Sequence, residues 1–310
     1  MNEDVNATAR LMWTKYDGIM WSRPEQVQTP DQRGHTPLGL FAYKYHLYCF
    51  HLDLNSYLSW NIYDEQSGRW GGSERVVIRG EDIRVNSGIA AAAHANGFIY
   101  VVFAYPSHRK LMWTRFSPED GWSEVKPVIT AEGSEVESAR ISLAVYHGLL
   151  YCCYPNTTGP TTYATVLITH DTNKKTWGTP QPAQGERWEH TANISPYDED
   201  LHQMWVQHDG EAILTRTYND IRLDHWSEPR EVISIDGTRL KSMFDPVITP
   251  YNDNLYAILS RRDPIELYWI RRGPTANRWT NPQKLSGCLN ALHTPIAAYA
   301  GSLHCVFDAA

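Results

Sequence analysis

A tryptophan-centred phrase that recurs about every fifty residues is the feature that most restricts the fold of this chain. The tryptophans fall at Trp21, Trp70, Trp122, Trp177, Trp226 and Trp279, with gaps of 49, 52, 55, 49 and 53 residues. Most are followed by small, polar or proline residues and then an aliphatic one, as in Trp226-Ser227-Glu228-Pro229 before Val232. A period of this length, carried on short strands, is typical of a β-propeller with one blade per repeat.

The sequence between the tryptophans predicts three further strands in each repeat. Residues 35–79 give a complete example, with apolar segments at 36–43, 46–50 and 57–63 before the phrase at Trp70. Residues 8–28 hold the second half of a repeat and residues 293–310 hold a first half. We therefore predict one all-β domain over residues 1–310, a six-bladed propeller of four-stranded antiparallel blades. Its blades are expected at about 35–79, 87–130, 138–183, 190–233, 241–285, and 293–310 joined with 8–28.

Small residues gather in the first strand of each predicted blade, as in Ala90-Ala91-Ala92-Ala93. These strands line the central channel of a propeller, where six backbones converge and leave little room for side chains. Gly, Pro and Asn or Asp interrupt the chain too often for a helix of useful length.

Charge and composition narrow the classes of partner. The net charge is -7 and the pI is about 6.0, whereas nucleic acid and anionic membranes need a basic face. We expect neither as a partner, and the sequence leaves the oligomeric state open. The first residues have no apolar segment typical of a signal peptide, which favours a cytoplasmic protein. The five cysteines are an odd number without metal-ligand spacing, and the apolar strand contexts of Cys49, Cys152, Cys153 and Cys305 predict buried free thiols rather than a disulfide.

A second tryptophan precedes the first in four blades, at Trp13, Trp60, Trp113 and Trp269. Exposed aromatic faces stack on sugars, so Trp60, Trp113 and Trp269 are candidate glycan contacts. The alternative is that these rings fill the space between adjacent blades, and both interpretations stay open. For the recurring set from Trp21 to Trp279 packing is favoured, because a structural repeat must return in every blade.

The segments that lead into the first strands carry the other candidate ligand-binding residues. These segments should meet at one mouth of the channel, and a propeller's central funnel is a common binding place. The candidates there are His35, Arg140, His190, Asp245 and His293. Three histidines on one rim could also act in acid–base chemistry. No carboxylate spacing supports a metal site, and no glycine-rich phosphate loop or cofactor motif occurs, so we expect neither metal nor cofactor.

The blade phrase resembles the fungal fucose-lectin type of six-bladed propeller. The resemblance covers the whole chain, but only in repeat layout. It implies a sugar-binding pair, an Arg two residues before the second-strand Tyr and a Glu in the third strand. The first position holds His46, Phe98, Leu149 or Asn254 here, and the third-strand position holds Trp60, Trp113 or Trp269. The resemblance therefore implies the fold without the fucose-binding pair.

Two functional hypotheses from different classes follow. The first is a lectin-like propeller that recognises a glycan or another polar small molecule at a single site in the central funnel. The second is a cofactor-independent enzyme of secondary metabolism, of cyclase, isomerase or pericyclase type, which orients its substrate in the same funnel. Outside the structural positions the blades differ strongly, which favours one asymmetric site over a repeated one.

Overall fold

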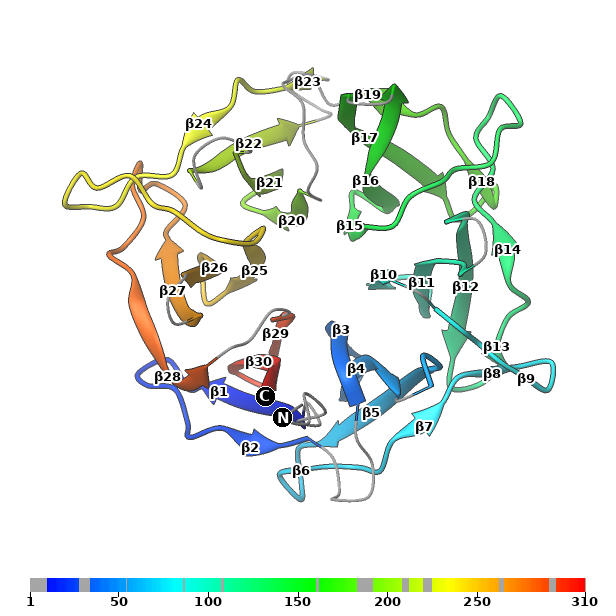
Figure 1. The fold of residues 1–310 in the computed structure, drawn as a ribbon, viewed down its shortest axis with the longest axis horizontal. Coiled ribbons are helices and arrows are strands. Elements are labelled where there is room, and N and C mark those ends of the chain that lie inside the picture. The colour runs from blue at the N-terminus through cyan, green and yellow to red at the C-terminus, as the bar shows by residue number, and fades with distance from the viewer. Residues whose placement is uncertain are drawn as a thin grey trace, which may run out of the picture.

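The chain forms a six-bladed β-propeller, as the tryptophan period predicts (Figure 1). This computed structural model describes residues 10–27, 34–53, 55–85, 87–106, 109–159, 162–182, 192–207, 212–219, 225–261, 265–289 and 294–309. Six antiparallel sheets surround a central channel, and no helix occurs among these residues. The inner strand of each sheet contacts the inner strands of both neighbouring sheets, so the ring is continuous.

Blades 1 to 3 each have three long strands and an outer strand broken into two short pieces. Blade 1 comprises β3 (Gly34–Tyr43), β4 (His46–Asp53), β5 (Leu58–Asp64), β6 (Arg69–Trp70) and β7 (Glu74–Arg75). Blade 2 comprises β10 (Ser87–His94), β11 (Phe98–Ala104), β12 (Leu111–Ser117), β13 (Gly121–Trp122) and β14 (Lys126–Pro127). Blade 3 comprises β15 (Ser142–Tyr146), β16 (Leu149–Gly159), β17 (Thr162–Asp171), β18 (Thr176–Trp177) and β19 (Gln181–Pro182). A small hairpin, β8 (Val77–Ile78) and β9 (Glu81–Asp82), follows blade 1.

Blades 4 to 6 complete the ring with the same order of strands. Blade 4 comprises β20 (Asn193–Tyr197), β21 (Asp200–Val206), β22 (Ile213–Asn219), β23 (His225–Trp226) and β24 (Arg230–Glu231). Blade 5 comprises β25 (Val247–Tyr251), β26 (Asn254–Arg261), β27 (Glu266–Arg272) and β28 (Gln283–Leu289). Blade 6 comprises β29 (Ile296–Tyr299), β30 (Ser302–Ala309), β1 (Arg10–Tyr16) and β2 (Glu25–Gln26).

Blade 6 draws its strands from both ends of the chain, which confirms the predicted split. Strand β1 pairs antiparallel with β30 along its whole length, from Arg10 opposite Ala309 to Tyr16 opposite Leu303. This pairing closes the ring and leaves no open sheet at the junction of the two termini.

The hydrophobic core lies between adjacent blades. The recurring tryptophans sit where the outer strand begins, and their rings pack across these gaps. Trp122 of blade 2, for example, lies 5.0 Å from Phe116 in its own blade and 5.5 Å from Trp60 in blade 1, measured between ring centroids. Trp177 and Trp279 are buried. The packing interpretation of the recurring tryptophans is therefore confirmed.

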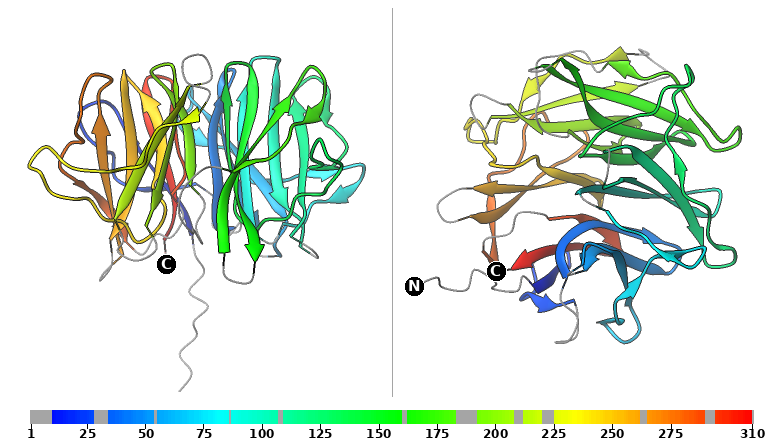
Figure 2. Two further views of the ribbon diagram at one scale, coloured as in Figure 1. Left: turned by 90° about the horizontal axis from the view of Figure 1, so that it is seen from above. Right: turned by 45° about the vertical axis from the view of Figure 1, so that its right-hand side comes forward.

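Each inner strand runs from one mouth of the channel to the other, along the axis that is upright in the left view of Figure 2. We call the end where connecting loops lead into the inner strands the loop mouth. The end where the inner strand turns back into the second strand is the hairpin mouth. In blade 5 the strand β25 separates Asp245 at the loop mouth from Tyr251 at the hairpin mouth. Six extended steps of about 3.3 Å place the two residues roughly 20 Å apart.

Candidate functional site

The loop mouth is the part of the channel to which the sequence assigned most candidate residues. His190 and His293 lie outside the described residues, and so does the side chain of His35, whose backbone belongs to β3. Arg140 and Asp245 are described. They stand before the inner strands of blades 3 and 5, with blade 4 between them. A ligand site formed by these five residues therefore stays a prediction.

Arg140 is exposed and its backbone is firmly placed. The Ser138 hydroxyl donates to the Arg140 carbonyl at 3.0 Å. The neighbouring residue Ala139 packs against Gly88, the bulged second residue of β10 with φ of +61°. A Cβ atom on Gly88 would lie 2.1 Å from the Ala139 carbonyl oxygen, so only glycine fits there. The close approach of these two backbones fixes the chain that carries Arg140.

Asp245 has a structural contact at the same mouth. Its Oδ1 accepts a hydrogen bond from the Val206 backbone N–H at 3.1 Å. Val206 ends β21, so the carboxylate ties the loop before blade 5 to the end of the second strand of blade 4. This contact uses one of the carboxylate oxygens, which reduces what Asp245 can offer a ligand.

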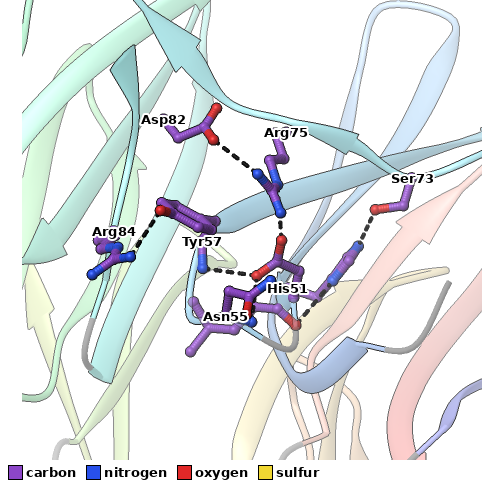
Figure 3. Close-up of polar contacts among 9 residues, drawn as sticks. His51, Asn55, Tyr57, Ser73, Arg75, Asp82 and Arg84 are labelled. Atoms are coloured by element: carbon purple, nitrogen blue, oxygen red, sulfur yellow. Dashed lines mark hydrogen bonds and ion pairs between the residues drawn. The ribbon is translucent and has the colours of Figure 1, made fainter.

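Figure 3 shows a polar cluster on the loop-mouth side of blade 1 that sequence reasoning missed. The Arg75 guanidinium binds Asp53 and Asp82, each at 2.9 Å. The Arg84 guanidinium donates to the Tyr57 hydroxyl at 2.8 Å. Both guanidinium groups also lie over the Tyr57 ring, 4.5 and 4.7 Å from its centroid.

The contacts of this cluster fasten the loop between β4 and β5 to the β8–β9 hairpin. Asp53 also accepts hydrogen bonds from the backbone N–H groups of Asn55 and Tyr57. Because Arg75 forms ion pairs with two carboxylates, its charge is already neutralised. We therefore interpret the cluster as a structural contact rather than a ligand site. The signal in the sequence was weak, since Tyr57 lies just before β5 and Arg75 lies in β7, 18 residues further along the chain.

The second set of tryptophans lies in the gaps between blades. Trp60 and Trp269 are 7% and 5% exposed, and Trp113 is partly buried. Trp60 makes an edge-on contact with Phe116 of the next blade at 4.8 Å between centroids. Trp269 lies 5.2 Å from Tyr16 of blade 6. Of the two interpretations left open by the sequence, this burial favours packing, and stacking on a sugar at these rings stays a prediction.

A pocket of about 550 Å³ lies at the hairpin mouth, at the opposite end of the channel from the predicted rim. Its lining comes from the hairpins of blades 4, 5 and 6 and from one loop of blade 5. The lining residues are Tyr197, Asp198, Pro250, Tyr251, Asn252, Asp253, Pro274, Ala298, Tyr299, Ala300 and Gly301. The tyrosines and prolines give apolar surface, and Asp198, Asn252 and Asp253 give polar groups at the rim.

The hairpins around this pocket are two-residue turns with left-handed backbone. Asp198 and Glu199 have φ of +50° and +65°, and Asn252 and Asp253 have +45° and +54°. Such turns match the twist of the paired strands, and Asn and Asp tolerate this conformation better than most residues. Asp198, Asn252 and Asp253 are thus exposed at the tips of short hairpins.

A ring of hydrogen bonds joins each hairpin to the preceding blade. The last aromatic or histidine side chain of each inner strand donates to a backbone carbonyl in the hairpin of the following blade. The six pairs are Tyr43 to Gly97, His94 to Gly148, Tyr146 to Glu199, Tyr197 to Asp253, Tyr251 to Gly301, and Tyr299 to Tyr45. His94 can replace tyrosine because its Nδ1 accepts from the Asn96 N–H, which leaves the proton on Nε2.

Three of these tyrosines line the pocket. Burial raises the pKa of Tyr197 above its ordinary value, with Asp198 adding to the shift. Burial likewise raises the pKa of Tyr251 and of Tyr299. All three are therefore neutral phenols whose O–H groups are donated to backbone carbonyls.

Metal and membrane features can be judged for the described part of the chain. No group of three or more His, Cys, Asp or Glu residues there could hold a metal ion. No helix formed by those residues is long and apolar enough to cross a membrane. Cys49, Cys152, Cys153 and Cys305 are free and buried, as predicted, and so is Cys288.

Comparison with solved structures identifies the fold. AofleA from Arthrobotrys oligospora is similar with a TM-score of 0.63 and 12% identity, over 96% of this chain and 89% of that one. The Aleuria aurantia lectin, solved with Fucα1-6GlcNAc, gives 0.59 and 13% over 84% of each chain. A GH43_1 enzyme from Xanthomonas citri gives 0.53 and 12%, over 76% and 89%. No protein-family model and no curated protein sequence matches the chain.

The fold therefore defines the class as a six-bladed β-propeller, and the predicted likeness to fucose-lectin propellers in repeat layout is confirmed. At identities of 8 to 14%, the likeness fixes the fold and carries no residue-level correspondence. What binds at the hairpin mouth must be argued from the residues of this chain.

Proposed function

We propose that this protein is a lectin-like binder that holds a glycan at one site, the pocket of the hairpin mouth. The observation that carries the proposal is the composition of the pocket wall. Tyrosine and proline surfaces alternate there with exposed carboxylates and an amide. A sugar presents apolar C–H faces and several hydroxyl donors, and this mixture of surfaces complements both.

The asymmetry of the ring supports a single site. Around the pocket, the hairpins carry Asp198-Glu199, Asn252-Asp253 and Ala300-Gly301. In the other three blades the turns are Lys44-Tyr45 in blade 1, Ala95-Asn96-Gly97 in blade 2 and His147-Gly148 in blade 3. The carboxylate-bearing turns are thus confined to adjacent blades, so the chemistry of the pocket is not repeated around the channel.

Binding is tested first by a glycan array with haemagglutination alongside. We expect signal on the array. Agglutination needs two sites in one particle, so with one site per chain it is expected only if the chains associate. A blank array at high protein concentration would contradict the proposal. NMR spectroscopy of the ligand after long incubation tests the alternative function, because isomerisation or cyclisation rearranges bonds without changing the mass, and appearance of a new compound would indicate an enzyme.

The location is tested by filling the pocket from its edge. Pro274 is exposed in the loop between β27 and β28, so Pro274→Trp adds bulk there without disturbing a strand. Pro229→Trp, at an exposed proline before β24, is the matched control. We expect loss of glycan binding in the first variant and none in the second. A ligand-bound structure with density at the loop mouth or between blades would refute this location.

A further inference from the structure

Hydrogen-bond acceptors outnumber donors in the pocket at the hairpin mouth. The hydroxyl protons of Tyr197, Tyr251 and Tyr299 are all donated to carbonyls of the next blade, at 2.9, 2.7 and 2.5 Å. Each phenolic oxygen can then only accept from a ligand. The carboxylates of Asp198 and Asp253 are acceptors as well, so Asn252 provides the one side-chain N–H donor among the lining residues.

The charge of the pocket points the same way. Asp198 and Asp253 are both exposed, and no Lys, Arg or His belongs to the lining. The nearby guanidinium of Arg272 is directed into the gap between blades 4 and 5. Its Nη2 lies 3.4 Å from His202 Nδ1, and its centre lies 5.4 Å from the Trp279 ring centroid. Burial lowers the pKa of Arg272 overall, while Tyr197 and then Asp198 raise it by smaller amounts.

We infer that the ligand of this pocket is an amino sugar, a polyhydroxylated ring that carries a protonated amine. The inference rests on the proposed function, glycan binding at this site. An ammonium group supplies three donors and a positive charge, and it is attracted both to carboxylates and to aromatic faces. The ring hydroxyls supply further donors for the phenolic oxygens. An acidic sugar would place a third negative charge beside Asp198 and Asp253, which disfavours it.

The test compares three oligosaccharides of equal length by calorimetric titration. They are a β-1,4-linked glucosamine oligomer, its fully N-acetylated counterpart and an oligogalacturonate, all at about pH 6, where the amine is protonated. Acetylation removes the charge and keeps the ring. We expect the glucosamine oligomer to bind best, about three- to tenfold tighter than the acetylated form, and the acidic oligomer not to bind. Raising the salt to about 0.5 M should remove most of that preference.

Two variants locate the effect at the two carboxylates. Asp198→Asn and Asp253→Asn each remove one charge, and Asn tolerates the left-handed backbone at φ of +50° and +54°. Each should weaken binding of the glucosamine oligomer by about two- to fivefold and leave the acetylated oligomer unchanged. Glu74→Gln removes the same charge from an exposed position in β7 and should alter neither affinity.

The outcomes separate this inference from the proposed function. If the acetylated oligomer binds as tightly as the glucosamine oligomer, or the two Asn variants behave like Glu74→Gln, the inference is overturned while glycan binding stands. If a linear polyamine binds as tightly as the glucosamine oligomer, charge alone is recognised and the amino-sugar assignment is overturned. If neither oligomer binds while the glycan array gives signal, the inference is overturned and the proposed function stands. If the array is blank as well, both fail.

Discussion

The Tyr299 hydroxyl donates to the Tyr45 carbonyl, linking blade 6 to blade 1 across the point where the two ends of the chain meet. It is the closing member of six such bonds around the hairpin mouth. The acceptor is the carbonyl of the final residue of the hairpin turn in every blade, although these residues share no common side chain. The same backbone position in each hairpin therefore accepts the bond that joins neighbouring blades, although the side chains at that position differ.

Removing one of these hydroxyls should lower stability by a small, measurable amount. Tyr299→Phe keeps the ring and leaves the Tyr45 carbonyl without its donor, so we expect a loss of about 0.5 to 1.5 kcal/mol in the free energy of unfolding. Urea denaturation followed by tryptophan fluorescence measures it. Tyr105→Phe, at a half-exposed tyrosine, is the control and should change stability by less than about 0.5 kcal/mol. Equal losses in both variants would argue against a role for the bond.

Gly88→Ala should be among the most damaging single substitutions in the chain. The added Cβ would lie 2.1 Å from the Ala139 carbonyl oxygen. The alanine would also have to adopt a φ of +61°, which is unfavourable for a residue with a side chain. We expect destabilisation of about 3 kcal/mol or more, from overpacking and backbone strain together. Gly133→Ala separates the two causes, because its φ is +83° but nothing lies within 4 Å. It should cost only about 1 to 2 kcal/mol by thermal or chemical denaturation.

Three buried histidines should make the fold sensitive to acid. Burial lowers the pKa of His170, His202 and His304 to about 4, below the ordinary value of 6.5. Between these values the unfolded chain takes up protons that the folded chain does not. The stability contributed by the neutral rings is therefore complete above pH 6.5 and is lost as the pH falls towards 4. Each histidine adds at most about 1.4 kcal/mol per pH unit to the slope of unfolding free energy.

His170 offers a direct check on this acid sensitivity. Its ring lies among Tyr100, Trp113 and Trp177, and neither ring nitrogen has a hydrogen-bond partner. Phe116 occupies the matching position in blade 2. We expect His170→Phe to fold, to gain stability near pH 5 and to show a shallower pH dependence, as measured by urea denaturation across the range. An unchanged slope would mean that His170 does not contribute.

Arg216 is a buried cation that donates a hydrogen bond to a side-chain amide. It is 5% exposed, its Nε donates to Gln203 Oε1 at 2.5 Å, and its guanidinium lies over the Trp205 and Trp226 rings. Burial lowers its pKa to about 10. Gln203→Leu should destabilise the fold by about 2 to 3 kcal/mol, because it removes an acceptor from a buried charge.

A double-mutant cycle with Arg216→Met tests that coupling. Methionine removes the charge and keeps an unbranched apolar side chain, so the double variant should lose less stability than the sum of the two single losses. Strict additivity in chemical denaturation would show that Gln203 and Arg216 act independently.

The architecture was readable from the sequence because its signal repeats. Each tryptophan from Trp21 to Trp279 marks the start of an outer strand. If each of the six strand boundaries is misplaced by one or two residues, the repeat length of about fifty residues is still recognised. The half-repeats at residues 8–28 and 293–310 even indicated the shared blade. Tyrosines such as Tyr251 were harder to interpret, because their acceptors are backbone carbonyls some fifty residues away that leave no trace in side-chain identity.

The candidate site was less accessible for a related reason. The loop mouth attracted attention because His35, His190 and His293 recur before inner strands, and recurrence is what sequence shows best. The pocket of the hairpin mouth depends on a feature that does not recur, the occurrence of Asp198 and Asp253 in the turns of adjacent blades. In the sequence those turns resemble ordinary hairpin connections. They line one pocket only because the propeller places the hairpins of adjacent blades side by side at the same mouth.

The pairing of β1 with β30 has a consequence for synthesis. Tyr16 is made near the beginning and its partner Leu303 near the end, 287 residues later. At about 5 to 20 residues per second, β1 waits roughly 15 to 60 seconds for its partner. During that time Leu11 and Trp13 can meet β2 and the core residues of blade 1, such as Leu47, but the β30 side of β1 stays unpaired. The ring therefore closes only as a late, long-range step.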